Sequence, residues 1–485
     1  MERLLAVLNV FSRIALMFAL AMLLPISISW WLGDGALTAF GTALTATLAC
    51  GAVAMLATQH ARRELRANDG ILLVVMCWVL LPCIATVPLL LGIPALDLAD
   101  AYFEAASGLT DSGATALSGL DLLPPSLNVW RAELHWIGGL GIIVLAVAVL
   151  PLLGVGGRQL MRAEVPSPIK DTSITPRITE TAKGFWKIYS GLTLLCMLIY
   201  RVLGMSWIDA LVHALSTVAL GGYSSHDASF AFFNSPAMEA VTIVFALISG
   251  MSYVTHLMAL SGRSLRPYLR DGELPFYLGV LGFSIVMIAC YLRYNGVYAD
   301  FLTALRYAAF NTVSMATTLG YASTDFSKWP LFAPLWLLFL CSFVTCASST
   351  GGGLKMMRAI ILYKQIFREI KRARHPNAIT HVKLGDTTVP DKIILAVLGF
   401  GFLYMASTIL LTLVLAASGM DIVSAFSAAV ACFNNTGPGL GVVGPDSNYG
   451  VLNDFQLWVC SFAVLLGRLE IFTLLVVLTP AFWRK

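Results

Sequence analysis

Residues 110–113 of the chain read Thr-Asp-Ser-Gly, and residues 434–437 read Asn-Asn-Thr-Gly. Both stretches are short, polar and glycine-ended, and each separates two apolar runs. Two related stretches, which end at Gly222 and Gly320, lie between them at similar intervals. Four such segments at a regular interval predict that the chain is an array of four equivalent units.

The amino-acid composition predicts an integral membrane protein. Of the 485 residues, 58% are hydrophobic and 12% are charged, whereas about a quarter of the residues of a soluble protein are charged. Many apolar runs reach the roughly 20 residues that a helix needs to cross a bilayer, which favours a helical bundle over a β-barrel. The nine cysteines lie almost wholly in apolar runs and form no Cys-x-x-Cys pair. This pattern is typical of buried hydrophobic side chains rather than of disulfides or a metal site.

The apolar runs also predict how the chain is divided. We expect an all-α membrane protein in which four pseudo-repeated helix, pore-loop and helix units surround one central pore, preceded by an N-terminal helical hairpin. The hairpin spans residues 1–68. The four units span residues 69–157, 158–262, 263–376 and 377–485.

Each unit is expected to contain a long helix, a short helix, a glycine loop and a second long helix. The predicted first helices span residues 71–91, 185–203, 275–292 and 393–417. The predicted short helices span residues 100–109, 209–218 and 423–433, and that of the third unit ends near Ala316. The predicted second helices span residues 129–153, 238–260 and 455–482, and that of the third unit begins near Pro330. With the hairpin, these elements give ten membrane spans.

The distribution of charge predicts which loops face the cytoplasm. Basic residues gather in alternate loops: Arg62, Arg63 and Arg66; Arg158, Arg162, Lys170, Arg177, Lys183 and Lys187; Arg263, Arg266 and Arg270; and those between residues 364 and 392. The segments that contain the glycine loops are acidic instead. Because cytoplasmic loops are rich in Lys and Arg, both termini are expected in the cytoplasm and the glycine loops outside.

The glycine stretches predict loops that enter the membrane from outside. Non-helical backbone at membrane depth is tolerated only where it is buried in protein or lines a watery cavity. If four such segments face one axis, their carbonyl oxygens can replace the hydration shell of a cation. Glycine suits this role because it permits backbone angles that aim successive carbonyls the same way. The final glycines are Gly113, Gly222, Gly320 and Gly437.

The short helices favour a cation as well. Each would direct its C-terminal end, which carries about half a negative charge, at the axis. Asp100 and Asp209 are expected to cap the outer ends of two of these helices. The alternative is that the stretches are ordinary extracellular loops in which a glycine ends a helix, but four aligned copies favour a pore.

Together these features resemble the Trk, Ktr and HKT superfamily of potassium transporters, over essentially the whole chain and including residues 176–183 (Pro-Arg-Ile-Thr-Glu-Thr-Ala-Lys). The resemblance implies that a potassium ion is held by the carbonyls of the two residues before each final glycine: Asp111 and Ser112, Leu220 and Gly221, Thr318 and Leu319, Asn435 and Thr436. In relatives, glycine at all four anchors goes with potassium and serine at the first goes with sodium. Asp111 departs from the usual hydroxyl residues, and whether its carboxylate approaches the ion is left open.

The resemblance also implies location and partners. It implies a multi-pass protein of the bacterial inner membrane, a homodimer, and a TrkA-like cytosolic nucleotide-binding ring that docks on the cytoplasmic face. Potassium is expected as the substrate. No tightly bound cofactor and no nucleic acid are expected.

Residues 348–353, Ser-Ser-Thr-Gly-Gly-Gly, interrupt the expected second helix of the third unit. Each glycine inside a helix costs about 1 kcal/mol relative to alanine, so the helix is expected to break there. The resemblance implies that Gly351, Gly352 and Gly353 form an intramembrane loop beneath the filter that gates the pore. A plain kink for close helix packing is the alternative.

Arg468 lies inside the apolar run from Leu457 to Leu478. An arginine at the centre of a span costs on the order of 2.5–3.5 kcal/mol on insertion scales, so it needs a partner or a wet cavity. The resemblance implies that Arg468 is a positive barrier in the pore below the filter. The alternative is a structural pair with a carboxylate elsewhere, since Glu470 lies on another face of the helix.

Three functions are compatible with a protein of this kind. The leading one is a gated pore through which potassium moves down its electrochemical gradient. The second is a secondary transporter that couples potassium to protons or sodium, a class that favours intramembrane carboxylates or histidines as relays; here deep acidic residues are few. An intramembrane enzyme is disfavoured because no nucleophile and base recur at helical spacing within a span.

Overall fold

The computed structural model describes residues 2–61, 66–141, 178–377, 380–385, 387–469 and 471–484. Several features of the sequence fall elsewhere. Outside the described residues lie the end of the second helix predicted for the first unit (142–153) and the boundary between the first two units at 157. So do six of the basic residues: Arg62, Arg63, Arg158, Arg162, Lys170 and Arg177.

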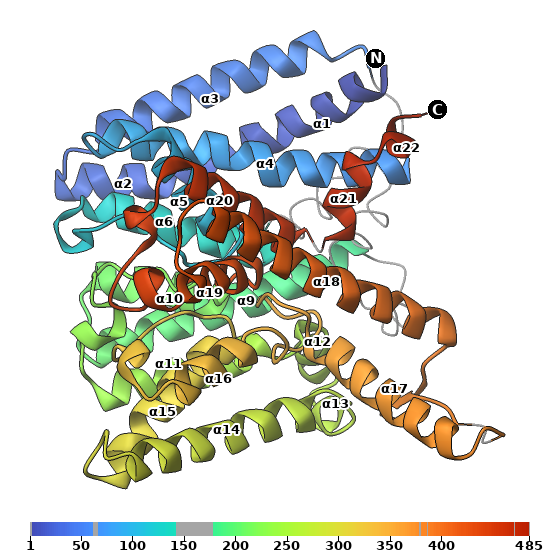
Figure 1. The fold of residues 1–485 in the computed structure, drawn as a ribbon. Coiled ribbons are helices and arrows are strands. Elements are labelled where there is room, and N and C mark those ends of the chain that lie inside the picture. The colour runs from blue at the N-terminus through green and yellow to red at the C-terminus, as the bar shows by residue number, and fades with distance from the viewer. Residues whose placement is uncertain are drawn as a thin grey trace.

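The N-terminal hairpin forms as predicted. Helix α1 (Glu2–Ala19) continues through a short 3-10 turn (Leu20–Met22) into α2 (Leu23–Leu32), and α3 (Leu37–Ala57) returns alongside α1. The turn between them begins at Gly33, whose φ of 63° is a left-handed conformation that glycine adopts without steric cost. The hairpin packs against the first unit through α4 and α6, on one side of the bundle in Figure 1.

The first helices of the four units are long and apolar. They are α4 (Ala67–Gly92), α9 (Ile178–Val202), α14 (Leu274–Tyr294) and α18 (Asp391–Ala417). Their outward faces carry large exposed apolar side chains such as Phe402 and Leu410, which suits contact with lipid. Within the described residues, six helices are long and apolar enough to cross a membrane, or eight if each bent helix pair is one span.

The short helices that precede the glycine loops also form. They are α5 (Leu98–Leu109), α10 (Trp207–Ala219), α15 (Phe301–Ala316) and α19 (Ile422–Phe433). The prediction that Asp100 and Asp209 cap the outer ends of two of these helices is wrong, because each aspartate lies three positions after the N-cap residue. Asp97 and Ser206 occupy the N-cap positions, and Asp100 and Asp209 lie in the first turn, where a carboxylate still favours the positive end of the helix dipole.

The prediction of a continuous second helix is wrong for the second and fourth units, whereas the second helix of the third unit is interrupted, as residues 348–353 lead us to expect. In the first unit α6 (Pro125–Trp136) runs into a π-helical turn, η3 (Ile137–Gly141). In the second, α11 (Pro236–Gly250) and α12 (Tyr253–Ser261) meet at 89°. In the third, α16 (Phe332–Leu340) ends well before α17 (Met356–Arg374) begins. In the fourth, α20 (Asp454–Arg468) and α21 (Phe472–Leu478) meet at 114°.

One of these breaks has a clear physical cause. The irregular segment between α16 and α17 inserts into the junction of α11 and α12. There, Cys346 N donates to Gly250 O at 3.0 Å, and Tyr253 N donates to Ser348 O at 3.0 Å. Backbone groups freed by the break in one helix are therefore satisfied by the interrupted helix of the next unit, as buried backbone requires.

The four units close a ring. Each short helix packs on a second helix of a neighbouring unit: α5 on α20, α10 on α6, α15 on α11 and α19 on α16. Helix α17 projects from the bundle on the side where both chain ends lie (Figure 1). A small hairpin of β1 (Lys383–Leu384) and β2 (Thr387–Thr388) contacts α17, and α13 (Arg266–Leu269) and α22 (Pro480–Trp483) lie on the same side of the bundle.

Candidate functional site

The four glycine loops share one backbone conformation. Two residues before each final glycine, φ is positive: 54° at Asp111, 65° at Leu220, 63° at Thr318 and 53° at Asn435. Each final glycine is also left-handed, with φ between 71° at Gly113 and 92° at Gly437. Positive φ is uncommon for residues other than glycine. Its occurrence at the same position of every loop indicates a shared structural requirement.

The left-handed residue, and not the final glycine, ends each short helix. The N–H of the next residue donates back to a carbonyl in the last turn, the bond that defines a Schellman motif. These bonds are Ser112 N to Ser107 O at 2.9 Å, Gly221 N to Ser216 O at 2.9 Å, Leu319 N to Ser314 O at 2.8 Å, and Thr436 N to Ala431 O at 3.0 Å. The final glycines are therefore required for something other than helix termination.

The final glycines are required because the loops meet in a closed ring. A Cβ added to Gly113 would lie 2.0 Å from Gly221 O, one on Gly222 would lie 2.0 Å from Leu319 O, one on Gly320 would lie 2.2 Å from Thr436 O, and one on Gly437 would lie 2.9 Å from Ser112 O. Each glycine thus lies against the carbonyl of the residue before the next glycine. The ring runs through all four units and returns to the first.

The ring brings together all the residues that the sequence predicts as ion ligands. Their side chains are buried, so the groups that face the axis are backbone oxygens and glycine Cα atoms. One carbonyl oxygen of each loop, that of Ser112, Gly221, Leu319 or Thr436, lies against the glycine of a neighbouring unit. Such an arrangement, with four helix C-terminal ends behind it, suits a dehydrated cation.

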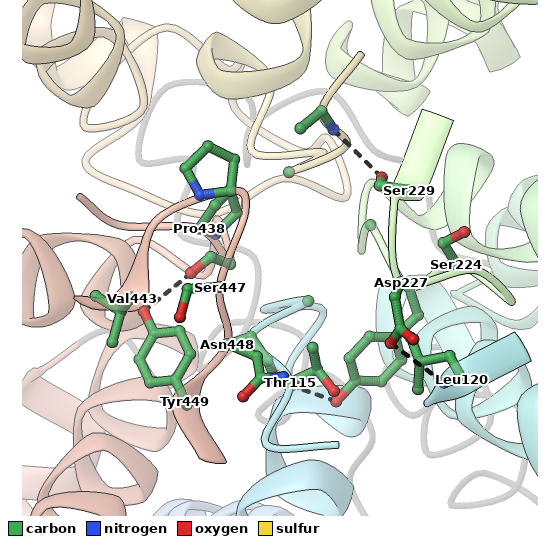
Figure 2. A pocket seen from close by; sticks show the side chains of 18 of the residues that line it. Thr115, Leu120, Ser224, Asp227, Ser229, Pro438, Val443, Ser447, Asn448 and Tyr449 are labelled. Atoms are coloured by element: carbon green, nitrogen blue, oxygen red, sulfur yellow. Dashed lines mark hydrogen bonds between the residues drawn. The ribbon is translucent and has the colours of Figure 1, made fainter. Parts of the chain in front are cut away.

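A cavity opens directly outside the ring. All four final glycines line it, together with Tyr223 and Tyr449. Figure 2 shows that Thr115 of the first unit, Ser224 of the second, and Ser447 and Asn448 of the fourth lie around this cavity. One face of the ring is therefore open to a cavity.

The loops are held in place by side chains that the sequence analysis did not identify. One polar residue of each short helix forms a hydrogen bond with the segment that follows the final glycine of the same unit. These bonds join Glu104 to Ala116 N at 2.9 Å, His213 to Ser224 Oγ at 2.9 Å, Asn311 to Ser323 Oγ at 3.0 Å, and Ser427 to Leu440 N at 2.8 Å. Glu104, His213 and Asn311 each lie nine residues before a final glycine. Aligning the units on their final glycines would place these three residues at one position, but because they are of three different types the shared position is not evident from the sequence.

Glu104 forms a buried ion pair with Arg131 of α6. Glu104 Oε1 lies 2.7 Å from Arg131 Nε, and the side chains are 0% and 1% exposed. Arg131 also donates to Ser224 O at 3.1 Å and lies over the ring of Tyr223. The pair therefore connects the loop of the first unit to the loop of the second.

A second charged cluster lies at the outer rim. His226 contacts the carboxylate of Asp121 through Nδ1, and its Nε2 lies 3.4 Å from Asp209 Oδ1. Burial alone would lower the pKa of His226, but the carboxylates of Asp209 and Asp121 outweigh it and raise that pKa above the ordinary value. His226 therefore connects the outer loops of the first two units through its contact with Asp121.

The glycines predicted as a gate lie in the irregular segment 341–355, directly beneath the ring. A Cβ added to Gly352 would lie 2.0 Å from Asn434 O, and one on Gly351 would lie 2.9 Å from Thr317 O. Gly352 N donates to Thr318 Oγ1 at 3.0 Å. The helix already ends at Leu340, earlier than residues 348–353, where the glycines predict the break. The segment contacts the inner ends of the loops and is more than a kink.

Arg468 ends α20 and lies beside the same segment. Its Nη1 donates to Thr350 O at 3.0 Å, and its Nη2 lies 2.9 Å from Asp111 Oδ2. Nη2 also donates to Gly138 O at 2.6 Å. Arg468 therefore has a carboxylate partner, as one of the two readings of the sequence requires. Arg468 also lies beneath the ring, which is where a positive barrier in the pore would lie, so the structural pair and the barrier are compatible.

Four short helices whose ends meet in one ring of backbone oxygens, inside a bundle of apolar helices, define a membrane transport protein of the pore-loop class. Comparisons with known proteins specify the family. The family model described as TrkH, cation transport protein, matches residues 36–485.

Individual relatives match the whole chain. The Trk system potassium uptake protein TrkH of Halomonas elongata is 46% identical over 481 residues, which cover 99% of both chains. The protein of the same name from Escherichia coli K12 is 43% identical with the same coverage. The crystal structure of the potassium transporter TrkH from Vibrio parahaemolyticus superposes with a TM-score of 0.90 at 39% identity, and covers 99% of this chain and 100% of that one.

The chain therefore belongs to the TrkH family of cation transport proteins. This membership confirms the resemblance seen in the sequence and the prediction of a transporter rather than an enzyme. The superposition confirms the all-α membrane fold.

Proposed function

We propose that the chain takes up potassium across the inner membrane of a bacterial cell through a gated, channel-like pore. The observation that carries this proposal is the closed ring of four glycines, each against the carbonyl of the next unit. A ring of backbone oxygens binds cations without a bound counterion or a proton relay. The relatives named as potassium uptake proteins support potassium as the cation.

In this proposal the filter consists of the two residues before each final glycine. The potassium-binding carbonyls belong to Asp111, Ser112, Leu220, Gly221, Thr318, Leu319, Asn435 and Thr436. Gly113, Gly222, Gly320 and Gly437 keep the path free of side chains.

The gate in this proposal is the segment 341–355 with Arg468. The segment contacts the loops of the third and fourth units through Thr318 and Asn434, and Thr350 Oγ1 lies 3.5 Å from Val218 O of the second. Arg468 completes the set by contacting Asp111 of the first unit. The segment contacts the second, third and fourth units and Arg468 contacts the first, so together they can obstruct the path below the ring, and opening requires the segment to withdraw.

Orientation and partners are part of the same proposal. We assign both termini, α13 and α17 to the cytoplasmic side, since the basic residues Arg266, Arg270, Lys371 and Arg374 lie there with the chain ends (Figure 1). We further propose that the protein is a homodimer and that a TrkA-like nucleotide-binding ring docks on this face. Light scattering of the purified protein, and its co-purification with such a ring, test these two points.

Radioactive rubidium flux into liposomes tests the function. The expected result is flux that follows a potassium gradient at fixed voltage and is unaffected by an imposed pH or sodium gradient. Flux that instead follows the proton or sodium gradient would establish a coupled symporter. The variant Gly113→Ser is expected to shift ion preference toward sodium, while Gly282→Ala, at a glycine with open space around it, is the control.

A further inference from the structure

The side chain of Asp111 sets it apart from its three counterparts. At the same left-handed position stand Leu220, Thr318 and Asn435, all of them uncharged. The Asp111 side chain is 1% exposed. One of its oxygens, Oδ2, faces Arg468, and the other, Oδ1, has no hydrogen-bond partner among the described residues. A buried carboxylate is costly unless it is paired, so Asp111 depends on Arg468.

Arg468 depends on Asp111 in turn. Its other partners near the ring are neutral carbonyl oxygens: Thr350 O at 3.0 Å, Gly138 O at 2.6 Å and Gly139 O at 3.3 Å. Among the described residues, Asp111 is the one acid that forms an ion pair with Arg468. Carbonyl dipoles satisfy the guanidinium N–H groups but leave its net charge in place.

The Asp111–Arg468 pair changes the electrostatic repulsion that a cation experiences when it leaves the ring. An unpaired guanidinium in a low-dielectric passage repels cations strongly. A carboxylate 2.9 Å away makes the pair neutral as a whole, and the field of such a pair falls off much faster with distance than that of a single charge. The carboxylate belongs to a residue of the filter itself, so this compensation stays in place when the segment 341–355 moves.

We propose that Asp111 is a positioning residue for conduction: its carboxylate neutralises Arg468 and so lowers the barrier that the arginine sets below the filter. This inference rests on the proposed function. It assigns the Asp111 side chain a task that its backbone carbonyl does not perform. It also makes Arg468 a bridge between the filter of the first unit and Thr350 of the gate.

Two substitutions with opposite expected signs test the proposal. Asp111→Asn keeps the shape and removes the charge, so Arg468 repels cations and binds Thr350 O more strongly. The potassium concentration for half-maximal rubidium flux should rise several-fold. Arg468→Gln leaves Asp111 unpaired, so that concentration should fall. The double variant should return toward the wild-type value.

A purely structural role of the pair predicts a different outcome. Loss of either partner would then lower the maximal flux in the same direction, and the double variant would not recover. That result, or a half-saturation concentration unchanged by Asp111→Asn, overturns the proposal. Asp391→Asn, which removes the same charge at an exposed position, is the control. Absence of flux from the wild-type protein would instead contradict the proposed function, so the two failures are distinct. If Asp111→Asn does not fold, Arg468→Gln alone still tests the proposal, because the potassium concentration for half-maximal flux should fall.

Discussion

Glu104 and Arg131 form an ion pair 2.7 Å long that has no access to solvent and lies directly behind the candidate filter. Glu104 also accepts hydrogen bonds from Thr115 Oγ1 and Ala116 N. The strand that leaves Gly113 is therefore fixed by the same carboxylate that compensates the arginine.

Replacing Glu104 by Gln should destabilise the protein and disturb the filter. Removal of one partner from a buried pair costs roughly 3–5 kcal/mol, because the remaining charge is left uncompensated. We expect a clear fall in Tm and a loss of rubidium-over-sodium preference in the fraction that folds. Glu239→Gln, at a pair whose arginine is 27% exposed, should lower Tm less. An equal fall in both variants would contradict a special role for the Glu104–Arg131 pair.

The ring of glycines makes a steric prediction. In Gly222→Ala the new Cβ meets Leu319 O at 2.0 Å, and the left-handed backbone adds roughly 1–2 kcal/mol of strain for any residue with a Cβ. Potassium flux should fall by about tenfold or more, since each 1.36 kcal/mol of lost stabilisation of the permeating ion is a factor of ten. Flux in liposomes and Tm should be measured together. Gly279→Ala, with no atom within 4 Å of the new Cβ, should leave both unchanged.

For the segment 341–355 beneath the ring, we predict that an added Cβ raises the flux rather than lowers it. In Gly352→Ala the added Cβ would lie 2.0 Å from Asn434 O. Both are backbone positions, so the segment must move away from the ring rather than adjust a side chain. We expect basal rubidium flux to rise several-fold, and deletion of residues 349–353 to raise it further. Lower flux in either folded variant, compared with Gly279→Ala, would contradict the assignment of the segment as a gate.

The sequence predicts the spans, the short helices and the positions of the four loops well, because these depend on local patterns. Apolar length identified α4, α14 and α18 to within a few residues of their observed bounds. The final glycines can be predicted because the ring of backbone contacts leaves no room for a Cβ at these positions. Each loop therefore needs a glycine at the same place, and this is visible in the sequence.

The break in the third unit is predicted by its glycines, but the breaks in the second helices of the second and fourth units could not be read from the sequence. The bend between Gly250 and Tyr253 depends on the segment around Ser348, which lies almost a hundred residues away in another unit. The apolar run from 455 to 482 likewise conceals the turn at Ile471, whose φ is 40°. At the Gly250–Tyr253 bend, hydrogen bonds from another unit satisfy the backbone groups that the interruption frees. The Asp111–Arg468 pair was missed for the same reason, since its partners come from the first and fourth units.

The cluster at His226 predicts a dependence of stability on pH. Four ionisable groups face one another here: His226, Asp121, Asp209 and, with its ring 6.4 Å from that of His226, His213. Burial opposes protonation of His226, but the two carboxylates raise its pKa above 6.5. A group with a raised folded-state pKa contributes stability that is fully present below its unfolded pKa and is lost as the pH rises through the folded pKa. The Tm difference between wild type and His226→Gln should therefore be largest near about pH 5.5 and shrink toward about pH 9. His375→Gln, at an exposed histidine after α17, is the control, and a His226 difference that grows with pH would show that the imidazole is neutral in the cluster.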